Sequence, residues 1–177
     1  ANQNGKLFER INTNYATNTF VLDTTAGINL ATCTTPNGLP CENAVLRPDN
    51  APICPVIDST SRYSFVTLRG GGLFVVDSKA TPMQIVAEYD RDTVHPNGCL
   101  GAEVPGKMYL DSGGGTPSNL FEADLYAFPV TGFSPANPPN TPPPVVVFSE
   151  DVDEADSHGA TLTKHLKHLW VADRGRN

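Results

Sequence analysis

A recurring strand-pair phrase is the feature of this sequence that most restricts its fold. The phrase begins at Lys6, Arg62, Lys107 and His168. Each copy has a basic residue or a histidine, then an alternating run of apolar and aromatic residues, then a polar turn rich in Gly or Asn. Such alternation between turn residues is typical of β-strands. Repeating units of about 40–50 residues that each carry several short strands predict the blades of a β-propeller.

The copies divide the chain into four parts and predict an all-β fold. We expect a partial β-propeller made of four-stranded antiparallel blades, in a single propeller segment over residues 1–177. A β-sandwich of about six to eight strands is the alternative, which the blade-like repeat disfavours. The four parts are a partial blade plus a disulfide loop over 1–50, a blade over 51–92, a blade with a Pro-rich insertion over 93–155, and the start of a further blade over 156–177.

The second copy has the clearest strand pattern, and the other copies follow it with interruptions. Residues 134–144 are rich in proline and predict a stiff, extended spacer on the outside of the third copy. Residues 159–171 read as strand, turn, strand. The other expected strands are Ala51–Asp58, Tyr63–Arg69, Gly72–Ser78 and Gln84–Tyr89 in the second copy, 6–13, 17–23 and 28–33 in the first, and Met108–Asp111, Phe121–Phe128 and Val145–Phe148 in the third.

The number of copies predicts that further blades complete the structure. Closed propellers contain about four to eight blades, whereas this chain has two nearly complete blades between two partial ones. An open stack of blades exposes apolar faces and unpaired strand edges, which favours association. We therefore expect the remaining blades to come from the same chain or from a partner protein chain.

The charge balance excludes two classes of partner. The chain has 12 Lys and Arg against 19 Asp and Glu, a formal net charge of −7. Nucleic-acid backbones and anionic membrane surfaces repel such a chain. No apolar run approaches the roughly 20 residues of a membrane-spanning helix, so we expect no membrane span.

Four cysteines predict disulfides and hence an oxidising compartment. They are Cys33, Cys41, Cys54 and Cys99, none of which forms a Cys-x-x-Cys unit, and three pairings are possible. Aligning the copies puts Cys54 and Cys99 at equivalent positions on neighbouring blades. This favours a Cys54–Cys99 bridge and a second bridge, Cys33–Cys41, which closes the short loop between Cys33 and Cys41. The alternative is four buried thiols in a cytosolic protein; disulfides instead predict a secreted or periplasmic location.

Two segments carry a resemblance to a known group of propellers. They are Asp156–Asn177, with Ser-His-Gly followed later by Leu-Trp-Val-Ala-Asp-Arg-Gly, and Ser64–Asp77, with Phe-Val-Thr-Leu-Arg-Gly-Gly-Gly-Leu-Phe-Val-Val-Asp. They resemble the blade phrase of the YVTN, NHL and lactonase-like β-propeller superfamily, well over residues 51–177 and loosely over 6–33. Long insertions after Cys33 and in the third copy depart from that pattern. The resemblance implies the fold, and it allows, without requiring, ester hydrolysis by a channel metal and a carboxylate.

Two histidines are the candidate metal ligands. His95 and His158 each begin an expected innermost strand, where side chains can point into a central channel. Imidazole nitrogens from neighbouring blades can hold a transition metal, and Asp92 or Asp156 would complete or orient the site. The alternative is that both histidines belong to turns and bond a backbone carbonyl.

A run of carboxylates is the candidate calcium site. Residues 150–156 contain five Asp and Glu, and calcium prefers such oxygen ligands. The spacing does not match the calcium loop Asp-x-Asp-x-Asp-Gly, and acidic runs are usually solvated. The cofactor prediction is therefore limited to a divalent metal, either calcium or a transition metal.

These features favour a binding function over a catalytic one. We expect an extracytoplasmic β-propeller segment that acts as a binding or assembly platform. The alternative is a metal-dependent hydrolase of the lactonase-like type, or an oxidoreductase, with its site in the propeller channel. No Gly-x-Ser-x-Gly elbow occurs in the sequence, so a serine nucleophile of that type is not expected.

Overall fold

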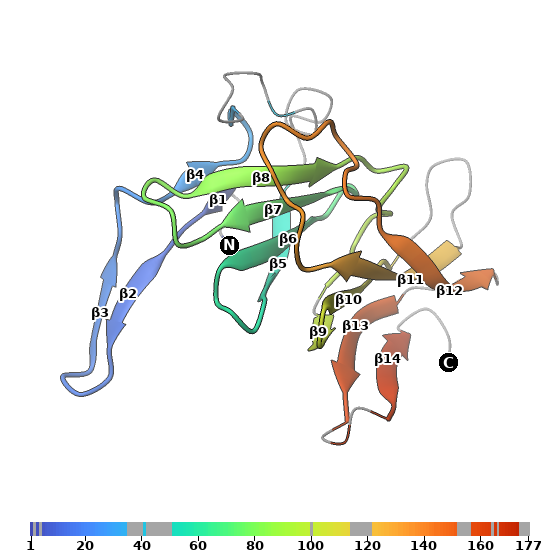
Figure 1. Cartoon of the computed structure of the whole chain (residues 1–177). Helices are drawn as coiled ribbons and strands as arrows, with labels where there is room; N and C mark the ends of the chain where they lie inside the picture. The colour runs from blue at the N-terminus through green and yellow to red at the C-terminus, as the bar shows by residue number, and fades with distance from the viewer. Residues whose placement is uncertain are drawn as a thin grey trace.

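Strands make up all the regular secondary structure in the described part of the chain (Figure 1). The computed structural model describes residues 1, 3, 5–34, 41, 51–99, 101–113, 122–151, 157–163, 165 and 167–173. The strands are β1 Leu7–Phe8, β2 Ile11–Asn14, β3 Thr19–Leu22, β4 Ile28–Asn29, β5 Pro52–Ile57, β6 Tyr63–Leu68, β7 Leu73–Asp77, β8 Gln84–Tyr89, β9 Gly101–Val104, β10 Lys107–Asp111, β11 Glu122–Pro129, β12 Val145–Asp151, β13 Ser157–Leu162 and β14 Leu169–Asp173.

Two four-stranded antiparallel sheets form the centre of the structure. One has the strand order β5-β6-β7-β8 and the other β12-β11-β10-β9, so neighbours in sequence are neighbours in the sheet. This simple up-and-down order is consistent with propeller blades and also with the alternative, a β-sandwich. The four strands expected in the second copy are all present, with ends that agree to within one residue, because each strand is bounded by turn residues. The all-β prediction with four-stranded antiparallel sheets is confirmed.

The β5–β8 sheet is buried on both faces. On one face, Phe65, Leu73 and Val75 belong to a core shared with β10 and β11. On the other face, Val66 and Phe74 belong to a core shared with the N-terminal strands and the Cys33–Cys41 disulfide. Because strand side chains alternate between faces, a strand buried on both sides is apolar throughout. This accounts for the apolar run 73–76 of β7. In β6 the run is interrupted by Ser64 and Thr67, whose buried hydroxyls are hydrogen-bonded to Ser78 and to the Gly98 carbonyl.

The first copy forms a bent two-stranded ribbon instead of three strands side by side. β2 pairs with β3, but β4 pairs with β1, so the strand expected near 28–33 does not lie outside β3. The cause is a turn at Asp23. The Asp23 backbone amide donates to the Arg10 carbonyl, and the Asp23 carbonyl accepts a hydrogen bond from the Ala26 amide. The turn returns the chain to β1, where Phe8 and Ile28 pack on the β5–β8 sheet.

Both favoured disulfides are present. Cys54 in β5 is bonded to Cys99, which precedes β9, and Cys33 is bonded to Cys41. The Cys54–Cys99 bond therefore joins the two four-stranded sheets. Next to it, a Cβ atom on Gly98 would lie 2.6 Å from the Asp111 carbonyl oxygen, so only glycine fits this close approach.

The Pro-rich segment lies against the free edge of β8. The Asn140 amide donates to the Glu88 carbonyl at 2.8 Å, and the Tyr89 hydroxyl donates to the Pro142 carbonyl at 2.6 Å. The Asn140 side chain also holds Asp90. Its oxygen accepts a hydrogen bond from the Asp90 backbone amide, and its nitrogen donates to the Asp90 carboxylate at 2.7 Å. The segment is thus more than a spacer, because it occupies backbone groups that an edge strand would otherwise present to other chains.

Residues 157–173 form the strand, turn, strand that the sequence predicts. β13 and β14 pair as a two-stranded sheet, and β13 lies beside β9 and β10. No helix in the described ranges is long and apolar enough to cross a membrane.

The two disulfides are expected to contribute unequally to stability. The Cys54–Cys99 bond closes 45 residues and the Cys33–Cys41 bond closes 8. The chain-entropy relation gives about 4 kcal/mol for the first and about 2.5 kcal/mol for the second. Equilibrium urea unfolding of the Cys54→Ala/Cys99→Ala and Cys33→Ala/Cys41→Ala double variants measures both losses. Equal losses would contradict the expectation.

Stability is expected to fall as the pH drops below about 4, the ordinary range of an Asp carboxyl. Burial of Asp90 opposes its ionisation, but hydrogen bonds from Asn140 and Thr93 outweigh burial and lower its pKa. Asp90 therefore has a lower pKa in the folded state than in the unfolded state. Its carboxylate stabilises the fold at pH values above the unfolded-state pKa, and this stabilisation is lost as the pH falls through the folded-state pKa. In thermal unfolding at a series of pH values, Asp90→Asn should show a weaker acid dependence. The exposed Asp92→Asn is the control and should follow the wild type.

Candidate functional site

The structure does not place His95 and His158 at matching positions. His95 lies in the turn between β8 and β9, ahead of Gly101, whereas His158 lies within β13. The cause is the His-Pro-Asn-Gly sequence, in which Asn97 adopts a left-handed φ of 62° and bonds the Arg69 carbonyl as part of a turn. The expectation that His95 begins an innermost strand is therefore wrong.

The predicted metal ligands do not assemble within the described residues. Asp156 and the side chain of His158 lie outside the described residues. Asp92 is exposed and lies 4.0 Å from Arg91, so it does not orient His95. No group of three or more His, Cys, Asp or Glu side chains with metal-binding geometry occurs in the part of the chain that the structure describes. A divalent metal remains a prediction.

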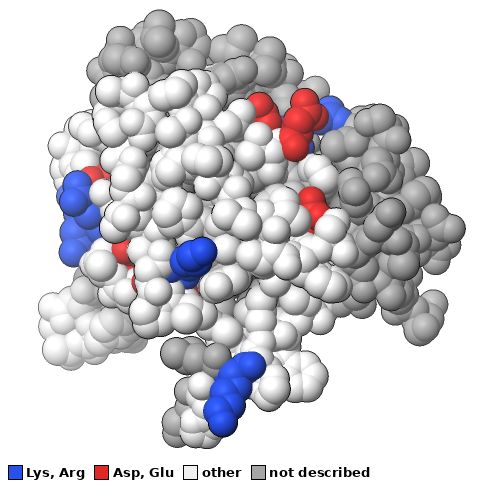
Figure 2. Space-filling view, turned by 45° about the vertical axis from the view of Figure 1, so that its right-hand side comes forward, with Lys and Arg blue, Asp and Glu red and all other residues white. Residues whose placement is uncertain are grey.

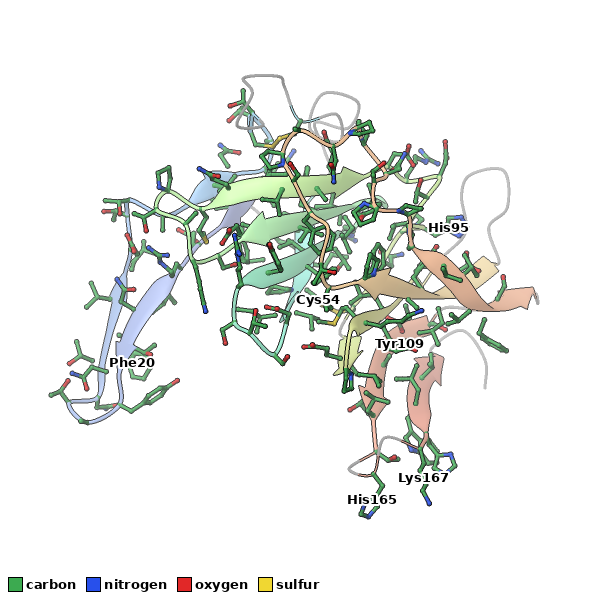
Figure 3. All side chains as sticks on the ribbon, in the orientation of Figure 1. Phe20, Cys54, His95, Tyr109, His165 and Lys167 are labelled. Atoms are coloured by element: carbon green, nitrogen blue, oxygen red, sulfur yellow. A yellow bond between two sulfur atoms is a disulfide. The ribbon has the colours of Figure 1, made fainter. Side chains whose placement is uncertain are left out.

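His95 instead contacts a carboxylate that the sequence did not single out. Its Nδ1 lies 3.4 Å from Asp124 Oδ2, within ion-pair range but not aligned as a hydrogen bond. The His95 side chain is only 12% exposed and the Asp124 side chain 9%. Figure 3 shows His95 far from His165 and Lys167, which lie at the tip of the β13–β14 hairpin as exposed surface groups.

Asp124 belongs to a buried network of polar side chains. Asp124 and Tyr126 lie two residues apart on β11 and so share a face of the strand. The Tyr126 hydroxyl donates to Asp124 Oδ2 at 3.1 Å and accepts from the His95 backbone amide at 3.1 Å. Ser112 closes the network, since its hydroxyl accepts from the Asp124 amide at 3.2 Å and lies 3.5 Å from the Tyr126 hydroxyl.

Burial is the main factor that keeps Tyr126 protonated. Burial of the phenol raises the pKa of Tyr126, and the nearby Asp124 carboxylate raises it further, while hydrogen bonds from Ser112 and the His95 amide act in the opposite direction. A neutral phenol is a hydrogen-bond donor, so Tyr126 holds the Asp124 carboxylate in place. The arrangement fixes the turn that carries His95 against β11.

A cavity of about 190 Å³ opens beside this network. Its polar lining is Asp111, Asp124 and Ser157, and its apolar lining includes Leu125, Phe148 and Val171. Asp111 is almost fully buried and accepts a hydrogen bond from the Gly159 amide at 2.7 Å. Carboxylates beneath an apolar rim suit a small cationic group on an apolar stem. The volume is below that of sites for drug-sized molecules, about 300–1,000 Å³.

Exposed apolar side chains also lie on β12 and β14, the two strands that carry Phe148 and Val171 of the cavity lining. We call them the C-terminal apolar surface: Val145, Val146, Val147 and Phe148 of β12, and Trp170 and Val171 of β14. Phe148 is 57% exposed and Trp170 is 65% exposed. Of these, Phe148 and Val171 also line the cavity, whereas Trp170, the neighbour of Val171 in the strand, lies on the other face of β14. Groups of exposed apolar side chains are candidate interaction sites.

Other candidate groups serve structural roles. The sequence Gly70-Gly71-Gly72 forms the turn between β6 and β7, where Gly71 and Gly72 have φ values of 93° and 92°. A glycine run between two strands is a tight turn, whereas phosphate loops precede a helix. Most of the described part of the face in Figure 2 is uncharged, and its charged side chains are isolated or form small groups in which red and blue lie close together, so the described residues show no large patch of one sign there.

Comparison with known protein families, curated proteins and solved structures found no match to this chain. The site therefore stands on its own geometry. Sequence reasoning missed Asp111 and Asp124 because each reads as one polar residue in an alternating strand. The one available signal was that Asp124 and Tyr126 share a strand face, although that face turned out to be buried.

Removing the Tyr126 hydroxyl is expected to destabilise the protein. Tyr126→Phe leaves the His95 amide and Asp124 Oδ2 without their partner in a buried setting, which costs about 1–3 kcal/mol. Urea unfolding measures the loss. Tyr15→Phe is the control, since Tyr15 is 81% exposed, and it should change stability by less than about 0.5 kcal/mol. Equal effects in both variants would show that the network contributes nothing.

Proposed function

We propose that this chain is an extracytoplasmic β-propeller segment that acts as a binding or assembly platform. Further blades, from the same chain or from a partner chain, complete it. The observation that carries the proposal is the C-terminal apolar surface, two of whose side chains, Phe148 and Val171, line a cavity with buried carboxylates. Apolar surface of this extent is unfavourable in water, and covering it is the main driving force of most protein association.

The strand order supports further blades as the partner that covers the C-terminal apolar surface. The β5–β8 and β9–β12 sheets pack face to face, and β13 lies beside β9 and β10 as the next layer. β13 and β14 form only a two-stranded sheet within the described residues. Strands added beside β14 would extend this layer into a four-stranded blade and would bury Trp170 and Val171. The resemblance to the YVTN, NHL and lactonase-like superfamily fits this geometry.

The two disulfides support an extracytoplasmic location. Disulfides persist in oxidising compartments and are rare in the cytosol. The Cys33–Cys41 bond closes a short loop, and the Cys54–Cys99 bond holds the two central sheets together. A secreted or periplasmic platform gains from such covalent links because it works without cytosolic chaperones.

A metal-dependent hydrolase or oxidoreductase is the second candidate. The contact between His95 and Asp124 beside a cavity favours it, since a carboxylate commonly orients a metal-binding or proton-transferring histidine. Metal analysis of the purified protein tests this candidate. Stoichiometric metal that is lost in His95→Ala and His158→Ala would support the enzyme over the platform.

Trp170 should report the covering of the C-terminal apolar surface. It is the one tryptophan of the chain, so its fluorescence has a single source. In the isolated 177-residue chain, acrylamide should quench Trp170 readily because the side chain is exposed. In the protein isolated from its source, quenching should fall and the emission should shift to shorter wavelength.

A matched pair of variants tests whether the surface drives assembly. Phe148→Asp should prevent the change in Trp170 quenching, because it places a charge in the contact. Ile57→Asp is the control, since Ile57 is 50% exposed on β5 and lies outside this surface. Equal quenching of Trp170 in the isolated chain and in the source protein would contradict the platform proposal.

A further inference from the structure

We propose that the β2–β3 ribbon is a self-association surface on which a second copy of this chain packs. The inference goes beyond the proposed function, because it concerns a different surface and a different partner. Figure 1 shows the ribbon projecting away from the two central sheets, and Figure 3 places Phe20 on it. Every residue of β2 and β3 is exposed.

The ribbon has one apolar face and one largely polar face. Ile11 pairs with Leu22 and Thr13 pairs with Phe20, and residues paired across an antiparallel ladder share a face. Tyr15 joins this face, since its ring packs edge-on against Phe20 at 5.9 Å. The opposite face carries Asn12, Asn14, Thr19 and Val21. A strand pair with one apolar and one polar face is typical of a sheet that buries its apolar face.

The apolar face has no cover within the described residues. Ile11 is 58% exposed, Phe20 is 55% exposed and Leu22 is 47% exposed. A two-stranded hairpin without packing on either face is marginally stable in water. Burial of this face by a partner would therefore stabilise the ribbon as well as the contact.

The ribbon is held in a fixed direction at its base. The Arg10 guanidinium bonds Asp23 at 2.7 Å, the Ser78 carbonyl at 3.0 Å and the Thr81 hydroxyl at 2.9 Å. These contacts tie the ribbon to the connection between β7 and β8. At the tip, the Asn14 side chain accepts hydrogen bonds from the Ala16 and Thr17 amides and shapes the turn. A surface ordered before binding loses less entropy on association.

Charge favours a second copy as the partner. The chain has a net charge of −7, so two copies repel each other over most of their surfaces. Residues 11–22 contain no Asp, Glu, Lys, Arg or His. In a two-fold symmetric contact the residues close to the axis meet their own copies, so a charge there would meet a like charge. The ribbon avoids that repulsion, and it lacks the lysines and prolines that usually keep exposed strands from associating.

The ribbon faces also supply a matched test. Phe20 and Val21 are neighbours, each 55% exposed, and they lie on opposite faces. The 177-residue chain is examined by sedimentation velocity over a concentration series from about 1 to about 500 µM, since small contacts of this kind are weak. We expect a dimer that forms with increasing concentration. Phe20→Asp should weaken dimerisation at least about thirtyfold, as for a central contact residue, and Val21→Asp less than about threefold.

Further variants keep the test decisive. Leu22→Asp lies on the apolar face and should act like Phe20→Asp, and circular dichroism confirms that each variant is folded. A wild-type chain that is monomeric throughout the series overturns the proposal, as do equal effects of Phe20→Asp and Val21→Asp. Phe148→Asp separates the two surfaces: if it abolishes the dimer while Phe20→Asp does not, the C-terminal apolar surface is the contact. Binding of a monomeric chain to phosphatidylcholine vesicles that is lost in Phe20→Asp would make a lipid surface the partner, which also overturns the proposal.

Discussion

Burial of both faces of the β5–β8 sheet is the constraint on which the rest of the structure depends. Aromatic rings fill the contact with the β9–β12 sheet, where Phe128 packs edge-on against Phe65 at 5.9 Å and against Tyr89 at 5.2 Å. Such rings combine a large buried area with a preferred geometry, so they set how the two sheets face each other. The N-terminal strands cover the other face. A sheet that is apolar on both sides has to lie between two layers.

This layered packing also positions the polar site. Tyr126 belongs both to the aromatic core and to the network with Asp124 and Ser112, so its ring is fixed by packing and its hydroxyl by hydrogen bonds. The network lies where the β9–β12 sheet meets β13, next to the cavity. Apolar side chains stay exposed where the layers end, on β12, β14 and the β2–β3 ribbon. The exposed apolar side chains therefore lie at the margins of the stack and the polar cluster lies within it.

The sequence predicted some features well because they depend on local patterns. The strands of the second copy follow from alternation between turn residues, and the two disulfides agree with the alignment of Cys54 and Cys99 on neighbouring repeats. It failed where a short polar segment allows two conformations. The turn at Asp23 sends β4 back to β1, and the turn at Asn97 takes His95 out of the strand. Turn residues predict where a strand ends, but they do not predict the direction of the chain after the turn.

The sequence by itself determined the class of the structure: all-β, with short strands in four-stranded sheets and cysteines spaced for two bridges. It could do so because strand periodicity and turn composition are properties of adjacent residues. Only the tertiary structure decided that Asp124 lies beside His95, that Asp111 lines a cavity, and that one face of the β2–β3 ribbon is left uncovered. These features depend on which residues that are distant in the chain come together. The packing of the sheets decides this through the burial of apolar side chains, and no pattern of adjacent residues reveals which sheets will pack together.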